Sequence, residues 1–137
     1  MSDRFLLDTN VLSESRRKES NAGVQAFLSR TDPTLLHISV LTVGELRKGV
    51  ALKRRADADA ARRLESWVDG LEMNFAGQIL GIDVAIARLW GEWSAARPRP
   101  VVDTLLGATA RVHDLVLVTR NTIDVADLPI RSLNPWK

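Results

Sequence analysis

The sequence predicts an α/β fold with a central, mainly parallel sheet of four to five strands. Short apolar runs, typical of strands buried on both faces of such a sheet, occur at 5–7, 35–40 and 115–118. Amphipathic stretches of helical length lie between them, and this alternation favours helices on both sides of the sheet. No repeat, low-complexity segment or linker interrupts the 137 residues, so we expect one domain over 1–137.

The first half of the chain alternates between expected strands and expected helices. The apolar run 5–7 ends at Asp8, and helices are expected over 10–18 and 21–30, where apolar residues recur at helical spacing. Asp32 and Pro33 mark a turn before the strand at 35–40. A helix over 41–55 contains Thr42 and Glu45 at the spacing of a capping box, and an amphipathic helix over 57–71 follows it.

The second half repeats the pattern with shorter strands. A short strand is expected at 79–82, followed by a helix over 83–96 that Asp83 caps. The segment Arg97-Pro98-Arg99-Pro100 cannot be helical, because each proline restricts its own backbone and that of the residue before it. A helix over 102–113, entered through Asp103, leads to the strand at 115–118, and a polar loop over 119–129 precedes a last strand at 130–133.

Composition excludes several classes of site. The chain contains no Cys and two His, which excludes disulfides, thiolate metal sites and cysteine nucleophiles and leaves little material for zinc. The formal net charge of +2 is too small for a polybasic nucleic-acid binder, so an anionic partner would need a local basic patch. No apolar run reaches the length of a membrane span and no signal peptide precedes the first strand, so we expect a cytoplasmic protein without a membrane partner.

Four acids occupy similar places in the expected fold. Asp8 follows the first strand, Glu45 lies in the helix after the second, Asp103 precedes the strand at 115–118, and Asp124 lies just beyond that strand. Because parallel strands end on one edge of a sheet, where ligands bind, these carboxylates are expected to converge. Converged carboxylates repel one another unless a cation is present, and hard oxygen ligands favour Mg²⁺ or Mn²⁺. Two such ions can activate a water and stabilise the leaving oxygen of a phosphodiester.

Each acid also has a purely structural interpretation. Asp8 and Asp103 could serve only as helix caps, since Asp is a preferred N-cap residue. Glu45 could serve only to complete the capping box with Thr42. Asp124 could be a solvated loop residue.

Three segments, at residues 6–14, 39–49 and 102–110, each contain one of the acids Asp8, Glu45 and Asp103. These segments resemble the motifs of PIN-domain ribonucleases, and most closely those of the VapC and FitB toxins of bacterial toxin–antitoxin pairs. The regions 117–124 and 133–136 resemble the C-terminal part of that family. The matches follow the family's order over nearly the whole chain. The resemblance implies a PIN-like three-layer α/β/α fold, with Asp8, Glu45 and Asp103 as metal ligands.

The fourth ligand position departs from the family pattern. Many members place an acid directly after Thr-Arg, where this chain has Asn121. Asp124 lies three residues further on and is the expected fourth acid, with Asp127 as a possible substitute and Asn121 as a possible holder of a water.

The resemblance implies a Mg²⁺-dependent endoribonuclease, with Mn²⁺ as a possible substitute, that acts as the toxin of a toxin–antitoxin pair. It also implies an RNA substrate, a cognate antitoxin and a homodimer. A non-catalytic RNA-binding or protein-interaction module on the same fold is the alternative. Aspartyl-phosphate chemistry at Asp8 is disfavoured, because that signature requires a second acid where this chain has Asn10. The tryptophans at 67, 90 and 93 recur at helical spacing, which favours packing roles.

Overall fold

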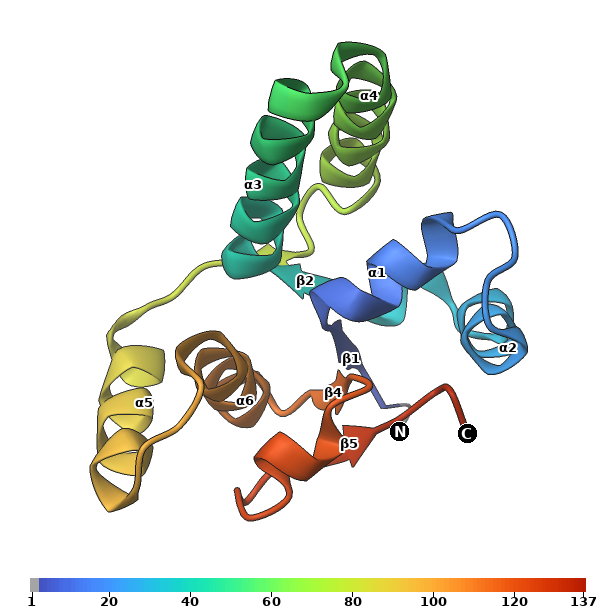
Figure 1. Cartoon of the computed structure of the whole chain (residues 1–137). Helices are drawn as coiled ribbons and strands as arrows, with labels where there is room; N and C mark the ends of the chain where they lie inside the picture. Colours follow the sequence, from blue (N-terminus) through green and yellow to red (C-terminus); the bar gives the residue numbers. More distant parts are fainter. Residues whose placement is uncertain (1–2) are drawn as a thin grey trace.

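A computed structural model describes residues 3–137, which form a five-stranded, wholly parallel sheet between two layers of helices (Figure 1). The strand order is β3-β2-β1-β4-β5. The strands are β1 (Phe5–Leu7), β2 (Leu36–Ser39), β3 (Ile79–Leu80), β4 (Val116–Val118) and β5 (Ser132–Leu133). The expected three-layer α/β/α fold is confirmed, and every strand in it is parallel.

Helices α1 to α4 cover one face of the sheet, and α5 and α6 cover the other (Figure 1). The first layer consists of α1 (Thr9–Arg16), α2 (Ala22–Arg30), α3 (Val40–Ala56) and α4 (Ala58–Asn74). The second consists of α5 (Val84–Ala96) and α6 (Val101–His113). Short 3₁₀ helices span Pro33–Leu35 and Thr122–Val125.

The central strands are apolar throughout because successive side chains enter different cores. Leu7 and Val118 pack with α1 to α4, whereas Leu6 and Leu117 pack with α6. All four are at most 2% exposed. A strand buried on both faces has no polar side, which is why these runs are continuous rather than alternating.

Three local expectations are wrong. Thr42 and Glu45 do not form a capping box, because α3 begins earlier and the Ser39 hydroxyl caps it by accepting from the Leu41 amide. Asp103 does not cap α6, because that helix begins at Val101 with Pro100 as its N-cap residue. The segment 119–129 is not merely a polar loop: it contains the second 3₁₀ helix and buries two apolar side chains, those of Val125 and Leu128.

The C-terminal segment closes the fold against α2. A Cβ added at Gly23 would lie 2.2 Å from the carbonyl oxygen of Pro135, so only glycine allows this approach. Within residues 3–137, the structure contains no helix with the length and apolar character needed to cross a membrane.

Candidate active site

The site begins where β1 and β4 end side by side. Leu7 pairs with Val118 in the sheet, so the next residues, Asp8 and Thr119, also lie beside each other. The Asp8 amide continues the ladder by donating to the carbonyl of Val118 at 2.9 Å. The pairing therefore places a carboxylate and a hydroxyl together at the carboxyl edge of the sheet, where parallel α/β proteins bind ligands.

Asp8 is 6% exposed, and each of its oxygens accepts hydrogen bonds. The Thr9 amide donates to Oδ1 at 2.7 Å, and the Thr119 hydroxyl donates to Oδ2 at 2.8 Å. The side-chain amide of Asn10 donates to the same Oδ2 at 3.3 Å. Asp8 thus does cap α1, as its structural interpretation required, yet it is more extensively bound than a cap needs to be.

Burial raises the pKa of the Asp8 carboxyl above its usual value, and the negative charge of Glu45 raises it further. The hydrogen bonds from Thr119 and Thr9 lower the pKa and so favour the carboxylate form. Burial therefore makes the charged form of Asp8 costly, and the two hydrogen-bond donors offset part of that cost.

Glu45 reaches the same edge from the first turns of α3. Its Oε1 accepts from the Thr9 hydroxyl at 2.6 Å, and that hydroxyl also lies 3.3 Å from the buried hydroxyl of Thr42. The side chain of Glu45 is otherwise exposed. The partner of Glu45 is therefore on α1, next to Asp8, rather than in its own helix.

Asp103 lies half-buried in the first turn of α6 and completes the approach from the other layer of helices. Burial raises the pKa of its carboxyl, and the charges of the other three candidate acids raise it further. Asp8, Asp124 and Glu45 contribute to this effect in that order. Asp103 therefore lies within electrostatic reach of the other three acids, although the four come from four separate segments.

The fourth position is shared by two exposed residues. Asp124 lies in the second 3₁₀ helix, close enough to Asp103 to raise its pKa. Asn121 lies closer to β4, and its backbone amide donates to the Thr119 hydroxyl at 3.0 Å. Both are exposed and both are next to the acids, so the geometry leaves either able to complete a site.

Asp127 is committed elsewhere. Each of its carboxylate oxygens accepts from both Arg97 and Arg99, in four bonds of 3.0 to 3.1 Å. These arginines hold the pKa of Asp127 far below its usual range. Arg99 is itself buried, with 6% of its side chain exposed, and its Nε donates to the carbonyl of Trp93 at 3.0 Å. The Arg-Pro-Arg-Pro connector thus ties the segment before Asp103 to the segment after Asp124.

Several basic residues of the first layer of helices are paired with acids. Arg47 bonds to Asp69 and Glu72, and other pairs join α3 to α4 or lie within one helix. Arg16 and Lys48 differ, because neither makes an ion pair with another residue of 3–137. Each lines a hollow that also includes Glu45. These two cations are therefore available to an anionic ligand beside the acids.

The carboxylate and amide oxygens of these side chains suit a hard divalent cation, although the acids do not enclose one in this arrangement. Among residues 3–137, no three side chains of His, Asp or Glu are close enough together to hold a metal ion as they stand. Beside Asp8, however, the amide oxygen of Asn10 is buried and has no hydrogen-bond partner in the described part of the chain. An unpartnered buried oxygen next to repelling carboxylates is a place where a cation, or a water that it holds, would satisfy both.

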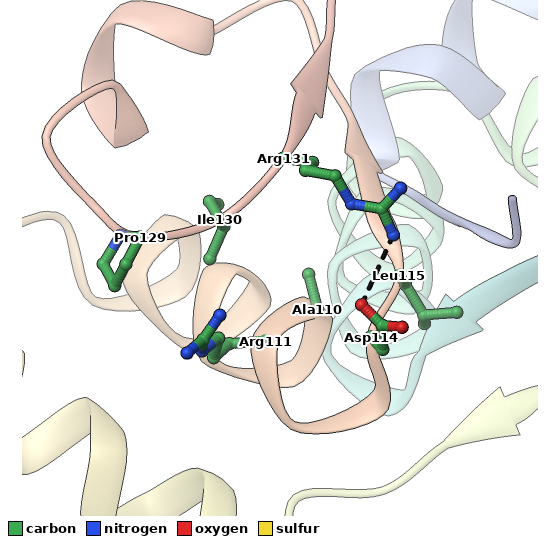
Figure 2. A pocket seen from close by; sticks show the side chains of 7 residues that line it. All are labelled: Ala110, Arg111, Asp114, Leu115, Pro129, Ile130 and Arg131. Carbon is green, nitrogen blue, oxygen red and sulfur yellow. Dashed lines mark hydrogen bonds and ion pairs between the residues drawn. The ribbon is translucent and has the colours of Figure 1, made fainter.

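Another hollow lies at the opposite end of α6 and contains none of the candidate acids (Figure 2). It measures about 300 Å³ and lies between the last turn of α6 and residues 129–131. Arg131 lines it and is paired with Asp114 at 3.4 Å and with Asp3 at 2.6 Å. The chemistry-bearing residues are therefore concentrated at the other end of this helix.

Sequence reasoning missed Thr119 and Thr9, which bind two of the candidate acids. A signal for Thr119 was present, because it follows a buried strand directly, as Asp8 follows β1. For Thr9 no comparable signal exists, since the distance between α1 and α3 decides its contact with Glu45.

Comparisons with known proteins agree with this geometry. A family model described as "PIN domain" matches residues 5–128. The toxin FitB of Neisseria gonorrhoeae is 33% identical, over 96% of this chain and 98% of FitB. Ribonuclease VapC4 of Mycobacterium tuberculosis is 37% identical, over 92% of each chain.

Solved structures show the same fold. FitAcB from Neisseria gonorrhoeae superposes with a TM-score of 0.88 and 31% identity, covering 96% of this chain and 98% of that one. A toxin–antitoxin complex from Klebsiella pneumoniae superposes with a TM-score of 0.68 and 26% identity, covering 98% of each chain.

Proposed function

The chain belongs to the PIN domain family, and from that premise we propose that it is a metal-dependent endoribonuclease and the toxin of a toxin–antitoxin pair. The observation that carries the proposal is the approach of Asp8, Glu45, Asp103 and Asp124 at the carboxyl edge of the sheet. Relatives named as a ribonuclease and as a toxin match over nearly the full length of the chain. Hydrolysis of RNA phosphodiester bonds is the reaction that fits both the four acids and the names of these relatives.

We assign Asp8, Glu45 and Asp103 as the ligands of Mg²⁺, with Mn²⁺ as a substitute, and Asp124 or Asn121 as the group that completes the site. When bound, a divalent ion would activate water and offset charge on the leaving oxygen. The exposed side chains of Glu45 and Asp124 would turn toward the two less exposed acids to enclose it. Either one or two ions are compatible with this donor set.

The remaining residues of the site support the acids and the substrate. The hydrogen bonds from Thr119 and the Thr9 amide favour the carboxylate form of Asp8, which is the form that binds a cation. The hydroxyl of Thr9 fixes Glu45 toward the same point. The positive charges of Arg16 and Lys48 would attract the RNA to either side of Glu45, and Lys48 would hold a phosphate of its backbone. Because its proposed substrate is cellular RNA, we expect the protein to act in the cytoplasm.

Two protein partners belong to the proposal. Structural relatives include a toxin–antitoxin complex, which supports a small antitoxin as partner. A second copy of this chain is the other partner, because apolar side chains of α3 lie on the surface. Val40 is 42% exposed and Leu52 is 51% exposed, and both line one hollow beside Glu45.

The test is RNA cleavage by the purified chain. End-labelled cellular RNA is incubated with wild type, Asp8→Asn and Asp59→Asn in Mg²⁺, in Mn²⁺ and in EDTA. Asp59 is a matched control, because it lies exposed on α4 and, within residues 3–137, forms an ion pair with Arg62 alone. We expect cleavage by wild type and Asp59→Asn, loss in Asp8→Asn, and loss in EDTA.

Two other results would overturn the proposal. Equal cleavage by Asp8→Asn would place the activity outside these acids. RNA binding without cleavage in either metal would favour the non-catalytic module. Comparing Asp124→Asn with Asn121→Ala in the same assay decides which residue completes the site.

A further inference from the structure

We propose that the hollow between α1, α3 and α4 is a pocket for one unpaired nucleobase of the RNA substrate. This inference rests on the proposed function and adds a specificity site to it. The pocket measures about 210 Å³, which is smaller than the sites of drug-sized ligands and suits a single small group. It begins at Thr9 and Glu45, so it is continuous with the candidate active site.

One wall of the pocket is a stacking surface. The guanidinium of Arg16 lies over the ring of Trp67 at 5.7 Å from the ring centre. Guanidinium planes and aromatic rings are the surfaces on which proteins stack unpaired bases. The spacing of Trp67 predicts a packing role, and this side chain does pack against the core, yet it is incompletely buried and lines the pocket.

The other walls supply polar groups at the edges and open space between them. Thr9, Ser13 and Arg16 follow one another at helical spacing along α1, so all three face the pocket. A base held there would meet two hydroxyl groups and a cation. At Gly49 on α3, an added Cβ would meet no atom within 4 Å, so the absence of a side chain keeps the pocket open.

The charge of Arg16 is free to act on a ligand. The neighbouring Arg17 pairs with Glu14, whereas Arg16 makes no ion pair with any residue of 3–137. Arg16 ends α1, and Asp8 caps the start of the same helix. The Arg16 guanidinium makes no ion pair among these residues and lies over the Trp67 ring, so it is suited to anchoring the nucleotide next to the bond that is cut. The pocket would thereby select single-stranded RNA, because a paired base could not enter it.

The experiment separates base binding from backbone binding. Labelled ten-nucleotide RNAs of one base each, and a ribose phosphate chain of the same length without bases, are titrated in Mg²⁺ by fluorescence anisotropy. All variants carry Asp8→Asn so that the RNA stays intact. We expect at least one base to improve binding over the base-free chain by roughly 5- to 150-fold, the range for stacking one base.

Filling the pocket should abolish that preference. Gly49→Leu places a side chain in the opening, and Gly91→Leu is the matched control, since it lies exposed in α5 with open space around it. Leucine forms helices better than glycine, so both variants are expected to fold. Arg16→Gln should also reduce the preference, whereas Arg88→Gln on α5 should not.

Several outcomes would overturn the pocket. These are equal binding of chains with and without bases, and an unchanged base preference in Gly49→Leu. Failure of the proposed function looks different. It is seen when the chain with Asp8 intact binds bases through this pocket but does not cleave RNA in Mg²⁺.

Discussion

Replacing Thr119 with valine tests how the fold supports Asp8. The Thr119 side chain is 2% exposed, and its hydroxyl donates to Asp8 Oδ2 at 2.8 Å. Valine keeps the shape but removes both the donor to Asp8 and the acceptor of the Asn121 backbone amide, so only the first part of the loss depends on the ionisation of Asp8. A hydrogen bond to a charged group is worth about 1.5–3 kcal/mol, so we expect a loss of about 2 kcal/mol in the free energy of unfolding at neutral pH.

The loss should depend on pH. The Thr119 hydrogen bond lowers the pKa of Asp8, so its removal raises that pKa further above the usual value. Stabilisation by Thr119 is present only where Asp8 is ionised, and it disappears as the pH falls through the folded-state pKa. The pH at which metal-dependent cleavage reaches half its maximum should therefore rise in Thr119→Val.

Urea denaturation at several pH values measures the effect, with Thr122→Val as the control. Thr122 lies in the second 3₁₀ helix, and its hydroxyl makes no hydrogen bond with the rest of residues 3–137, so its replacement should change stability by less than about 0.5 kcal/mol. A loss in Thr119→Val no larger than in the control, or one that persists undiminished in acid, would refute the reasoning.

Three further changes have expected outcomes. Asp103→Asn should stabilise the metal-free protein at pH 7, because the raised folded-state pKa of Asp103 means that its ionisation opposes folding. Thermal unfolding measures the gain. It should vanish below the ordinary aspartate pKa of about 3.9, where the carboxyl is protonated in both the folded and the unfolded state. Gly23→Ala should lower the free energy of unfolding by about 1–3 kcal/mol through its clash with Pro135. Gly70→Ala, with open space around it, should raise the free energy of unfolding. Urea midpoints compare the two variants, and equal midpoints would contradict the close approach of Pro135 to Gly23. Asp127→Asn should lower both the thermal midpoint and the cleavage rate more than Asp59→Asn does, because it leaves the buried Arg99 without its carboxylate partner.

The sequence alone was sufficient for the strands and for the places of the candidate acids in the fold, because both depend on local patterns. Continuous apolar runs such as 116–118 identify strands buried on two faces, and an acid that follows such a run lies at the binding edge. Helix ends were less predictable. Ser39 competes with Thr42 for the start of α3, and only the path of the preceding strand decides that Ser39 caps it.

Contacts between distant segments could not be predicted from the sequence. The bond from Thr9 to Glu45 depends on how closely α1 approaches α3, and the four bonds to Asp127 depend on the path of the Arg97–Pro100 connector. The pocket beside Trp67 requires three helices to meet, so helical spacing indicated only that this residue packs. These features arise from tertiary geometry, and local patterns carry no information about it.

Divalent cation binding by the acids is the central claim, and calorimetric titration of Mn²⁺ tests it without knowledge of the RNA target. Wild type and Asp103→Asn are titrated at pH 7, with Asp59→Asn as the control. We predict saturable binding by wild type and the control, and weak or no binding by Asp103→Asn. Equal binding by all three proteins, or no binding by wild type, would contradict the assignment of Asp8, Glu45 and Asp103 as a metal site.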